Sequence, residues 1–589
     1  MKENVTGKAF DLKVLRRIYR FTRPYKKGLF ASVALTILLA FLSPLRPLLI
    51  QYTVDNYIVH HDAQGLIKMM LIMIGLLIFQ SVIQYFHTFI TNWLGQTVIS
   101  DIRVKLFKHI ASLRLKYFDH TPIGTLVTRT VSDLEAIADI FSEGLIVIIG
   151  DLLQLVVIIG VMFFLDWRLT LISLSTIPVL LFATRIFQFG INKTFREVRT
   201  QVAALNTFVH EHITGMSIVQ IFNRENEEYS RFKKINNDHM VAHIRSVWYY
   251  SIFFPVVELL SATSIGLIVW WGSGGVITQE VSLGNVIAFI MFISMLFRPI
   301  RELADKFNTL QMGMVCSERV FKVIDTKEFI NDSGSITKKV KGNIRFENVW
   351  FAYNESADIE KTEWIIKDLS FEIEEGKTLA LIGATGAGKT SIINLVSRMY
   401  DFQRGKIFID DIDIKEYKLD NLRQQIAIVL QDVFLFSDSI QNNITLNDKS
   451  ISRDTVAMAA KEVGADGFIN RLPGKYDFNV MERGAMLSVG QRQLISFIRA
   501  YVFNPTILIL DEATSSIDSE SEELIQQATT TLTKNRTSII IAHRLATIQN
   551  ADKIIVMDKG RKIEEGNHQD LLRQNGLYKE LYEIQFTDV

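Results

Sequence analysis

The sequence predicts two parts of different kinds: an all-α membrane domain of six helices with long cytoplasmic helical extensions, followed by an α/β domain. About six apolar stretches long enough to cross a bilayer lie within the first 310 residues. Hydrophobic residues make up 48% of the chain and phenylalanine occurs 39 times, which indicates that part of the chain lies in lipid. From about residue 343, short β-branched runs alternate with helical segments, as in α/β domains built around a largely parallel sheet.

Length, charge and cysteine content narrow the class of protein. A chain of 589 residues is too long for one domain. The net charge of +1 argues against a general nucleic-acid binder, because such proteins carry a marked basic surplus. The single cysteine, Cys316, forms no internal disulfide, which fits a reducing compartment.

The first 27 residues are basic and amphipathic. They lack the short apolar core and small-residue cleavage site of a signal peptide. We therefore expect residues 1–27 to form a cytoplasmic segment, with a helix on the membrane surface.

The apolar stretches and the basic residues between them predict the topology. Lysine and arginine fill the N-terminal segment and the connections 94–140 and 189–248, whereas "DNYIVHHDAQG" and "GSGGVITQEVS" contain neither. By the positive-inside rule, both termini and both long connections are cytoplasmic, so the sequence predicts a multi-pass protein of the cytoplasmic membrane. The predicted spans are 28–53, 66–93, 141–165, 168–188, 249–272 and 283–304.

The two long connections are predicted to be helical extensions of the spans, because their apolar residues keep helical spacing. Each is interrupted once, at "FDHTPIG" and at "TGMSIVQIF", and these breaks could rest on a cytoplasmic partner.

Two carboxylates, Asp151 and Glu258, fall inside predicted spans. An acid in a span is costly and is by default a candidate for contact with cargo. The alternative is that Asp151 lies near a membrane boundary and that Glu258 makes an interhelical hydrogen bond.

The strongest motif is "GATGAGKT", residues 383–390, which matches G-x-x-x-x-G-K-[ST] between a strand and a helix. Its glycines let backbone N–H groups turn around phosphates, Lys389 supplies a charge for the β and γ phosphates, and Thr390 can bind Mg²⁺. The motif predicts a P-loop nucleotide-binding domain over 343–589, joined by a linker, 311–342, to a transmembrane domain over 28–310.

The apolar strand "TILILDEA" ends in Asp511 and Glu512. Two carboxylates at the end of a buried strand need a cation or a proton to offset their cost. Asp511 is suited to Mg²⁺ and Glu512 to general-base activation of water. An Asp-Glu pair alone is usually a solvated strand end, and only the preceding phosphate loop favours the functional interpretation.

Three further residues can be assigned roles only because the phosphate loop and the Asp-Glu pair are present in the same domain. Tyr353 ends the first strand of the domain and could stack on adenine. Gln431 leaves a strand and could reach a metal and the attacking water, and His543 follows the last core strand and could contact the γ-phosphate. A fourth feature, "MLSVGQRQL" at 486–494, opens a helix whose N–H groups point at an anion that the surrounding sequence does not supply.

Taken together, these motifs show that the chain resembles an ATP-binding-cassette half-transporter of the exporter type, similar to bacterial multidrug and lipid-A exporters. The resemblance covers essentially the whole chain. In order it shows the A-loop Tyr353, Walker A 383–390, the Q-loop Gln431, the signature "LSVGQ", Walker B ending in Asp511 and Glu512, the D-loop "SSID" and the switch His543.

The resemblance implies ATP and Mg²⁺ as cofactors and assigns roles to these positions. The catalytic residues would be Glu512, His543 and Gln431, and the metal ligands Thr390, Gln431 and Asp511. The nucleotide would be bound by Tyr353, Gly383, Thr385, Gly386, Gly388, Lys389, Thr390, Ser391, Ser488, Gly490 and Gln491, the last three acting on an ATP held by a partner chain.

The implied function is ATP hydrolysis coupled to export or flipping of lipophilic or amphipathic drugs or lipids, by alternating access, with ATP at composite sites between two cassettes. The two breaks resemble coupling helices. The spans hold few charges, which suits a lipophilic or amphipathic cargo rather than an ion or a sugar. Membrane lipids are the other expected partners. The alternatives are an ATP-gated channel or regulator, a cassette ATPase without transport, and an importer.

Two residues depart from the family pattern, and both bear on whether the partner is a second copy of this chain or a different chain. Val489 replaces the first of two glycines in the usual L-S-G-G-Q, and Met481 stands where glycine is more common. Walker A, Glu512 and His543 are intact, so a homodimer is favoured and a heterodimer remains open. We expect the signature to work unless Val489 occupies a position that needs a positive φ.

Overall fold

The computed structural model describes residues 11–330, 332–354, 362–511, 519–542 and 545–586, which form two compact units. One unit joins the chain up to Ala111 with Ile123–Thr326, and the other joins Ser112–Pro122 with the chain from Lys327 onward. The predicted domain boundaries remain predictions, with one difference at the linker. Helix α13 continues to Asp325, so the first part of the predicted linker 311–342 is helical.

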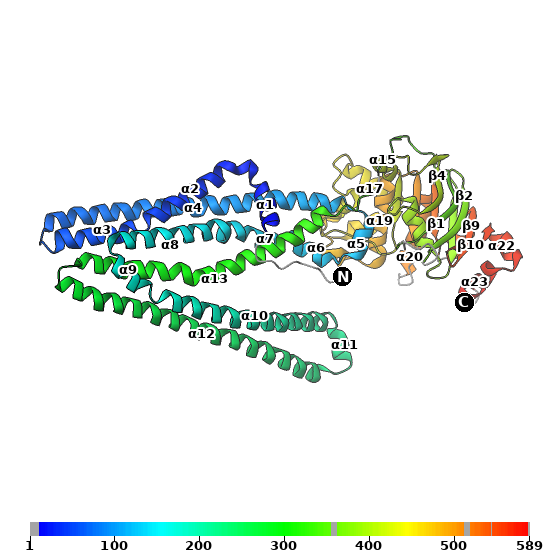
Figure 1. The fold of residues 1–589 in the computed structure, drawn as a ribbon. Helices are drawn as coiled ribbons and strands as arrows, with labels where there is room; N and C mark the ends of the chain where they lie inside the picture. Colours follow the sequence, from blue (N-terminus) through cyan, green and yellow to red (C-terminus); the bar gives the residue numbers. More distant parts are fainter. Residues whose placement is uncertain (1–10, 331, 355–361, 512–518, 543–544, 587–589) are drawn as a thin grey trace. The chain divides into compact units, whose positions relative to one another are not determined.

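The first unit is helical throughout (Figure 1). Short 3-10 and π turns at Arg23–Tyr25, Val54–Ile58 and Ile140–Gly144 join some of its helices. The helices are α1 (Leu12–Phe21), α2 (Lys26–Leu42), α3 (Leu45–Thr53), α4 (Ala63–Ala111), α6 (Ile123–Thr130), α7 (Ser132–Asp139), α8 (Leu145–Leu165), α9 (Trp167–Leu174), α10 (Ile177–Thr214), α11 (Met216–Ile221), α12 (Glu225–Ile277) and α13 (Leu283–Asp325).

Five helical segments of the described chain are long and apolar enough to cross a membrane: Arg23–Ile58, Ala63–Ala111, Ile123–Leu165, Trp167–Thr214 and Glu225–Ile277. The sixth predicted span, 283–304, lies in α13, where only the shorter stretch Leu283–Pro299 is apolar. The helical membrane region is confirmed, but the count of six is not, because arginines begin to interrupt α13 at Arg298.

The predicted helical extensions are present. Helix α12 has 53 residues, which at 1.5 Å per residue is about 80 Å, far more than the roughly 30 Å of a bilayer core. Helix α10 runs antiparallel beside it, and the short α11 joins their ends (Figure 1).

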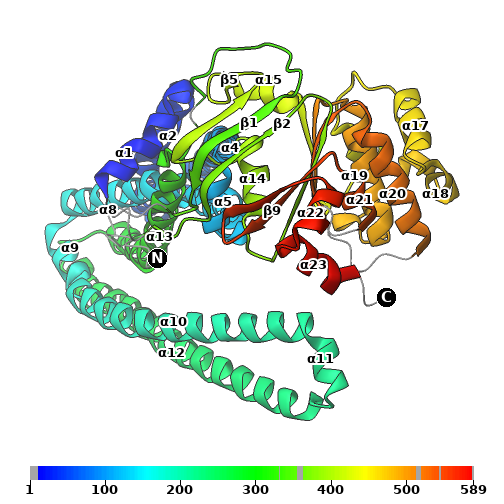
Figure 2. The same cartoon turned by 90° about the vertical axis from the view of Figure 1, so that its right-hand side faces the viewer.

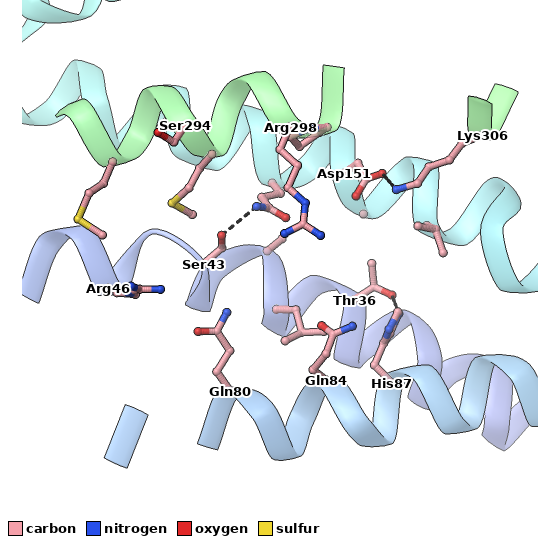
Figure 3. A pocket seen from close by; sticks show the side chains of 18 of the residues that line it. Thr36, Ser43, Arg46, Gln80, Gln84, His87, Asp151, Ser294, Arg298 and Lys306 are labelled. Atoms are coloured by element: carbon pink, nitrogen blue, oxygen red, sulfur yellow. Dashed lines mark hydrogen bonds and ion pairs between the residues drawn. The ribbon is translucent and has the colours of Figure 1, made fainter. Parts of the chain in front are cut away.

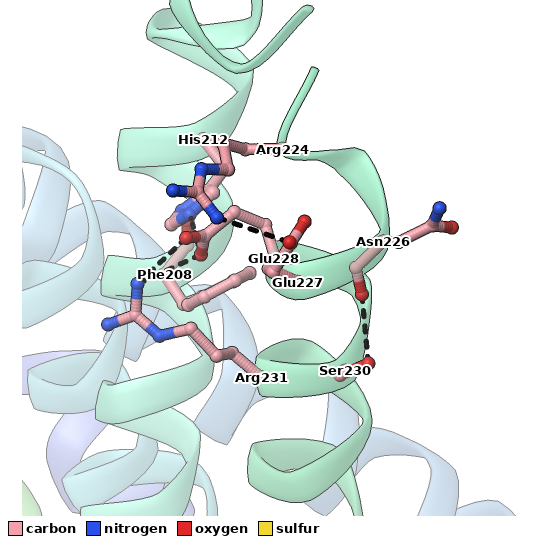
Figure 4. Close-up of polar contacts among 8 residues, drawn as sticks. All are labelled: Phe208, His212, Arg224, Asn226, Glu227, Glu228, Ser230 and Arg231. Atoms are coloured by element: carbon pink, nitrogen blue, oxygen red, sulfur yellow. Dashed lines mark hydrogen bonds and ion pairs between the residues drawn. The ribbon is translucent and has the colours of Figure 1, made fainter. Parts of the chain in front are cut away.

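Polar contacts hold the tip of this α10–α12 hairpin (Figure 4). His212 Nε2 donates to Glu228 at 2.7 Å, and Arg231 Nη1 donates to the same carboxylate at 2.9 Å. The carboxylate of Glu228 therefore ties α10 to α12 next to the predicted break "TGMSIVQIF". The exposed side chains of α11 and its end include Ile218, Ile221 and Phe222.

Helix α1 packs on protein within its unit, rather than only lying on a membrane surface as expected. Its Leu15 and Ile18 are buried in a cluster with residues of α4 and α13. Arg17 donates two hydrogen bonds to Asp325, both of 2.6 Å, which fixes α1 to the end of α13.

The second unit contains two sheets with helices around them (Figure 2). The antiparallel sheet has the order β2-β1-β4-β5, and the larger sheet has the order β10-β9-β3-β8-β7-β6, parallel except for β10. The strands are β1 (Ile344–Phe351), β2 (Ile366–Ile373), β3 (Thr378–Gly383), β4 (Arg404–Ile409), β5 (Ile412–Asp413), β6 (Ile426–Val429), β7 (Ile507–Asp511), β8 (Thr537–Ile541), β9 (Lys553–Asp558) and β10 (Arg561–Gly566).

Two apolar cores cover the faces of the larger sheet. One lies between it and the antiparallel sheet with α14, and the other lies under α16 to α20. The helices of this unit are α5 (Leu115–His120), α14 (Lys389–Val396), α15 (Leu419–Gln424), α16 (Ile440–Thr445), α17 (Arg453–Glu462), α18 (Asp466–Arg471), α19 (Val489–Val502), α20 (Ser519–Thr533), α21 (Leu545–Gln549), α22 (His568–Gln574) and α23 (Leu577–Phe586).

Candidate functional site

The sheet order brings the separate motifs of the second unit to one edge. Strands β3, β8 and β7 are neighbours and parallel, so their carboxyl ends lie together. The glycine-rich loop follows β3, and Asp511 ends β7 opposite Ile541 of β8. Gln431 leaves β6 on the other side of β7. Glu512, His543 and the segment "SSID" lie outside the described residues.

The glycine-rich loop has the backbone that phosphate binding requires. Gly386 and Gly388 have φ of +84° and +100°, a region that favours glycine. Gly388 is the N-cap of α14 and makes no side-chain cap, so the first N–H groups of the helix are not satisfied by a side chain. The start of α14 therefore fits an anion.

Lys389 is held inside this loop. Its side chain is buried, and Nζ donates to the carbonyl oxygens of Gly383 at 2.6 Å and Ala384 at 3.0 Å. Burial lowers the pKa of Lys389, while the charge of Asp511 acts in the opposite direction. A buried ammonium held by two neutral carbonyls would gain from an anion, so the residues present fit a bound phosphate chain.

The other predicted nucleotide contacts are distributed around the loop. Thr385 and Thr390 are exposed, and Ser391 is buried. Tyr353 Oη and Ser391 Oγ are hydrogen-bonded at 3.1 Å, and Asn394 donates to the same Oη at 3.2 Å. The ring of Tyr353 is thus fixed beside the loop and remains half-buried, as a platform for a base requires.

The predicted metal ligands offer a hydroxyl (Thr390), an amide (Gln431) and a carboxylate (Asp511). Such oxygen donors suit Mg²⁺. Thr390 and Gln431 are exposed, and Asp511 is half-buried at the end of β7. The donor set therefore fits a magnesium ion bound with phosphates.

The signature forms the first turn of α19. Ser488 Oγ accepts from the N–H of Gln491 at 3.2 Å, and Gln491 Oε1 accepts from the N–H of Ser488 at 3.0 Å. This reciprocal capping fixes the turn and leaves the hydroxyl proton of Ser488 to donate outward. Val489 is the first helical residue and is absent from the described residues with positive φ. The condition under which Val489 would disable the motif is therefore not met.

Met481, unlike Val489, has a positive φ. It has φ of 58° and ψ of −172°, a backbone region that only glycine adopts without strain. The departure from the usual glycine at this position therefore places a side chain on a strained backbone.

A residue that the sequence analysis missed is Tyr400, which follows α14. Its hydroxyl donates to the carboxylate of Asp119 in α5, and its ring meets that of Tyr353 edge-on, with centroids 4.9 Å apart. Burial, and then the hydrogen bond to Asp119, raise the pKa of Tyr400. Nothing in "SRMYDF" singles this tyrosine out, since its partner in α5 lies far away in the sequence.

The Ser112–Pro122 segment is also tied to the second unit at the start of its helix. The N–H of Arg114 donates to the carbonyl oxygen of Glu328 at 3.0 Å, and the side chains of the two residues pair at 3.5 Å. Arg114 precedes the break predicted at "FDHTPIG", and Asp119 within that break accepts a hydrogen bond from Tyr400. That the break rests on a cytoplasmic partner stays a prediction.

The helical unit contains a cavity of about 840 Å³ (Figure 3). Asp151 lines this cavity and pairs with Lys306 at 2.6 Å, while Glu258 is exposed on α12 and makes no hydrogen bond with a described residue. The sequence analysis missed Arg46 and Arg298, which also line the cavity. Both lie inside predicted spans, where a charged residue is itself a signal of a functional site.

Comparisons with known proteins match both units. Residues 29–300 match the family model described as ABC transporter transmembrane region, and residues 366–515 match the model described as ABC transporter. An uncharacterized ABC transporter ATP-binding protein of Bacillus subtilis is 37% identical over 99% of this chain and 96% of its own length.

Two further relatives have more specific names. An ATP-dependent lipid A-core flippase of Desulfotalea psychrophila is 35% identical over 97% of this chain and 99% of its own length. A protein of Staphylococcus aureus with the name "Putative multidrug export ATP-binding/permease protein" is 35% identical over 97% of this chain and 100% of its own length.

Proposed function

The chain belongs to the ABC transporter family, and we propose that two copies form an ATP-driven exporter of lipophilic or amphipathic molecules in the cytoplasmic membrane. The observation that carries this proposal is the start of α19. Its capped first turn leaves the Ser488 hydroxyl proton and the N–H groups outside the cap available to an anion, whereas the phosphate loop of the same chain begins a different helix, α14.

In the proposed site, the phosphate loop of one chain and the signature of a second chain hold one ATP. Lys389 and the N–H groups of α14 would bind the phosphates, and Thr390, Gln431 and Asp511 would hold Mg²⁺, which supplies charge stabilisation for phosphoryl transfer when bound. Ser488 would donate its hydroxyl proton to the γ-phosphate from the other side. We propose Glu512 as the base that orients water, with His543 at the γ-phosphate.

Transport follows from this arrangement if ATP has a higher affinity for the state in which the cassettes are closed. Such a ligand shifts the population toward that state without any other driving force. We propose that α5 and α11 transmit closure to the helical unit, that the cavity then opens outward, and that hydrolysis resets the cycle. The proposed orientation places both termini in the cytoplasm.

A mixing experiment tests the composite site. Lys389→Ala and Ser488→Ala chains each lose ATPase activity as homodimers, because every site contains the altered residue. When the two chains are assembled together, half of the dimers are mixed, and each mixed dimer contains one intact site. We expect roughly a quarter of the parent ATPase activity to return.

If each chain instead formed its own complete site, no mixture would regain activity, and the composite arrangement would be wrong. Export is tested separately in inverted vesicles with an amphipathic dye. ATP-dependent accumulation in the parent and none in Lys389→Ala is expected, whereas passive flux that persists in Lys389→Ala would favour a channel.

A further inference from the structure

Helix α1 and the start of α2 carry a local excess of positive charge. Residues 13–27 contain seven lysines and arginines, and no aspartate or glutamate occurs between Asp11 and Asp55. The two helices meet at a bend (Figure 1). The segment Arg23–Ile58, which is apolar enough to cross a membrane, begins at this bend. The charge therefore lies beside the point at which the chain enters its first apolar segment.

Helix α1 has two sides of opposite character. Leu15 and Ile18 are buried in a cluster with residues of α4 and α13. Arg16 and Arg20, which are one turn apart, are exposed on the other side of the helix. The apolar side thus anchors α1 to its unit, and the arginines remain outside the packed core.

The exposed cations continue past the end of α1. Arg23 lies in the 3-10 turn that follows, and Lys26 and Lys27 begin α2. All three are exposed. We call the following five residues the basic face: Arg16, Arg20, Arg23, Lys26 and Lys27. None of the five makes a side-chain hydrogen bond or ion pair with a described residue.

The acids next to the basic face are bonded elsewhere. Arg17 donates to both carboxylate oxygens of Asp325, and the hydroxyl of Tyr25 donates to Asp101 at 2.9 Å. Lys13 lines a groove that also contains a glutamate of α13, so we leave Lys13 out of the face. The charge of the basic face is therefore not neutralised by these neighbouring carboxylates.

Exposed apolar side chains flank the basic face in the chain. Leu12, at the start of α1, is 75% exposed, and Phe30, one turn into α2, is 72% exposed. The stems of lysine and arginine are also apolar and can lie along hydrocarbon while their charged ends reach water. Cations with apolar side chains beside them suit the boundary between lipid headgroups and acyl chains.

We propose that the basic face is a docking surface for acidic phospholipid headgroups of the cytoplasmic leaflet. A guanidinium contacts a phosphate through two parallel hydrogen bonds, and a cluster of about four to eight cations beside a membrane span is typical of such recognition. Because Arg17 ties α1 to Asp325, the last residue of α13, a docked headgroup also restrains the end of α13. The inference rests on the proposed membrane orientation, and the lipid is a bound partner rather than the transported molecule.

Amide hydrogen exchange of the full-length protein in lipid nanodiscs tests the inference. Nanodiscs of phosphatidylcholine alone are compared with nanodiscs that also contain phosphatidylglycerol with the same acyl chains. We expect exchange over residues 12–25 to be several-fold slower with phosphatidylglycerol, because the bound headgroups oppose opening of α1. High salt should remove the difference, since it screens charges at the surface.

Two double variants locate the effect. Arg16→Gln with Arg20→Gln leaves the buried side of α1 intact and should remove most of the slowing. Lys26→Gln with Lys27→Gln should do the same from the other side of the bend. Exchange of both variants in phosphatidylcholine should equal that of the parent, which shows that α1 still folds.

Lys233→Gln with Lys234→Gln is the matched control, because these are also adjacent exposed lysines, on the long helix α12. The control should keep the slowing of the parent. Equal exchange of the parent in the two kinds of nanodisc, or slowing that persists in both glutamine variants of the basic face, would overturn the inference. Inorganic phosphate that slows exchange equally in phosphatidylcholine nanodiscs would assign the face to a free anion and overturn the lipid assignment.

The outcome is separable from that of the exporter proposal, because none of these measurements uses ATP. Vesicles that accumulate no dye with ATP would remove the exporter function and leave the exchange result unchanged. Loss of the lipid effect alone would leave the exporter function in place.

Discussion

The hydroxyl of Tyr400 donates a hydrogen bond to the carboxylate of Asp119, a residue 281 positions earlier in the chain. The same tyrosine ring packs edge-on against Tyr353, whose hydroxyl is bonded to Ser391 directly after the phosphate loop. One side chain therefore joins the predicted adenine platform to α5, whose last residues begin the stretch "FDHTPIG" that we propose as a coupling helix.

Tyr400→Phe is expected to keep the ring contact with Tyr353 and to lose the link to Asp119. ATP binding should survive, while the stimulation of ATPase activity by substrate should fall, because α5 is no longer held to the nucleotide site. A double-mutant cycle with Asp119→Ala should give a coupling of about 1 kcal/mol in thermal stability. Tyr417→Phe removes another buried hydroxyl, bonded to Ile409, and should leave stimulation unchanged. Additive effects of Tyr400→Phe and Asp119→Ala would contradict the link.

Met481→Gly is expected to stabilise the cassette. The backbone of Met481 has φ of 58° and ψ of −172°, and relief of such strain is worth on the order of 1 kcal/mol after the entropy cost of glycine. Thermal melting of the purified transporter should shift upward. Met486→Gly, at a nearby exposed methionine without positive φ, should lower it. A downward shift for both variants would show that Met481 carries no strain.

Glu228→Gln is expected to loosen the tip of the α10–α12 hairpin. The neutral amide replaces a carboxylate that His212 and Arg231 both contact. Amide hydrogen exchange across Phe208–Arg231 should become several-fold faster. Glu227→Gln alters a more exposed pair, with Arg224, and should change exchange little. Unchanged exchange in Glu228→Gln would mean that helix packing alone holds the tip.

Acid should destabilise the cassette partly through Asp552. Burial of this carboxyl opposes ionisation, but hydrogen bonds from the N–H of Thr378 at 2.9 Å and from Lys377 at 3.0 Å outweigh it and lower its pKa. A lowered pKa in the folded state gives stability that is present above the ordinary aspartate value, about 4, and is lost as pH falls through the folded value.

The melting temperature of Asp552→Asn should therefore fall less steeply than that of the parent on acidification below about pH 4. Asp411→Asn is the control, because Asp411 has 80% of its side chain accessible and its ion pair with Arg345 is exposed to solvent, where such a pair contributes little. Parallel melting curves of Asp552→Asn and the parent over that pH range would show that the hydrogen bonds to Asp552 contribute nothing.

The helical region, the α/β region and the order of the nucleotide motifs could be predicted because they depend on local patterns. Apolar runs and helical spacing specify an element wherever it lies, and the strand before "GATGAGKT" indicates the phosphate loop without reference to its neighbours. The count of six spans is not confirmed, because Arg298 interrupts the apolar stretch of α13. Arg298 lines a cavity, and a hydropathy pattern alone does not show which residues face a cavity.

The residue pattern alone thus specified the family resemblance, the phosphate loop and the start of the signature helix, since each depends on residues within a few positions of one another. Only the tertiary structure showed that Tyr400 meets Asp119, that Arg46 and Arg298 line one cavity with the Asp151–Lys306 pair, and that Met481 rather than Val489 has the unfavourable backbone. These features depend on contacts between distant segments and on dihedral angles set by the surrounding chain, which no local pattern records.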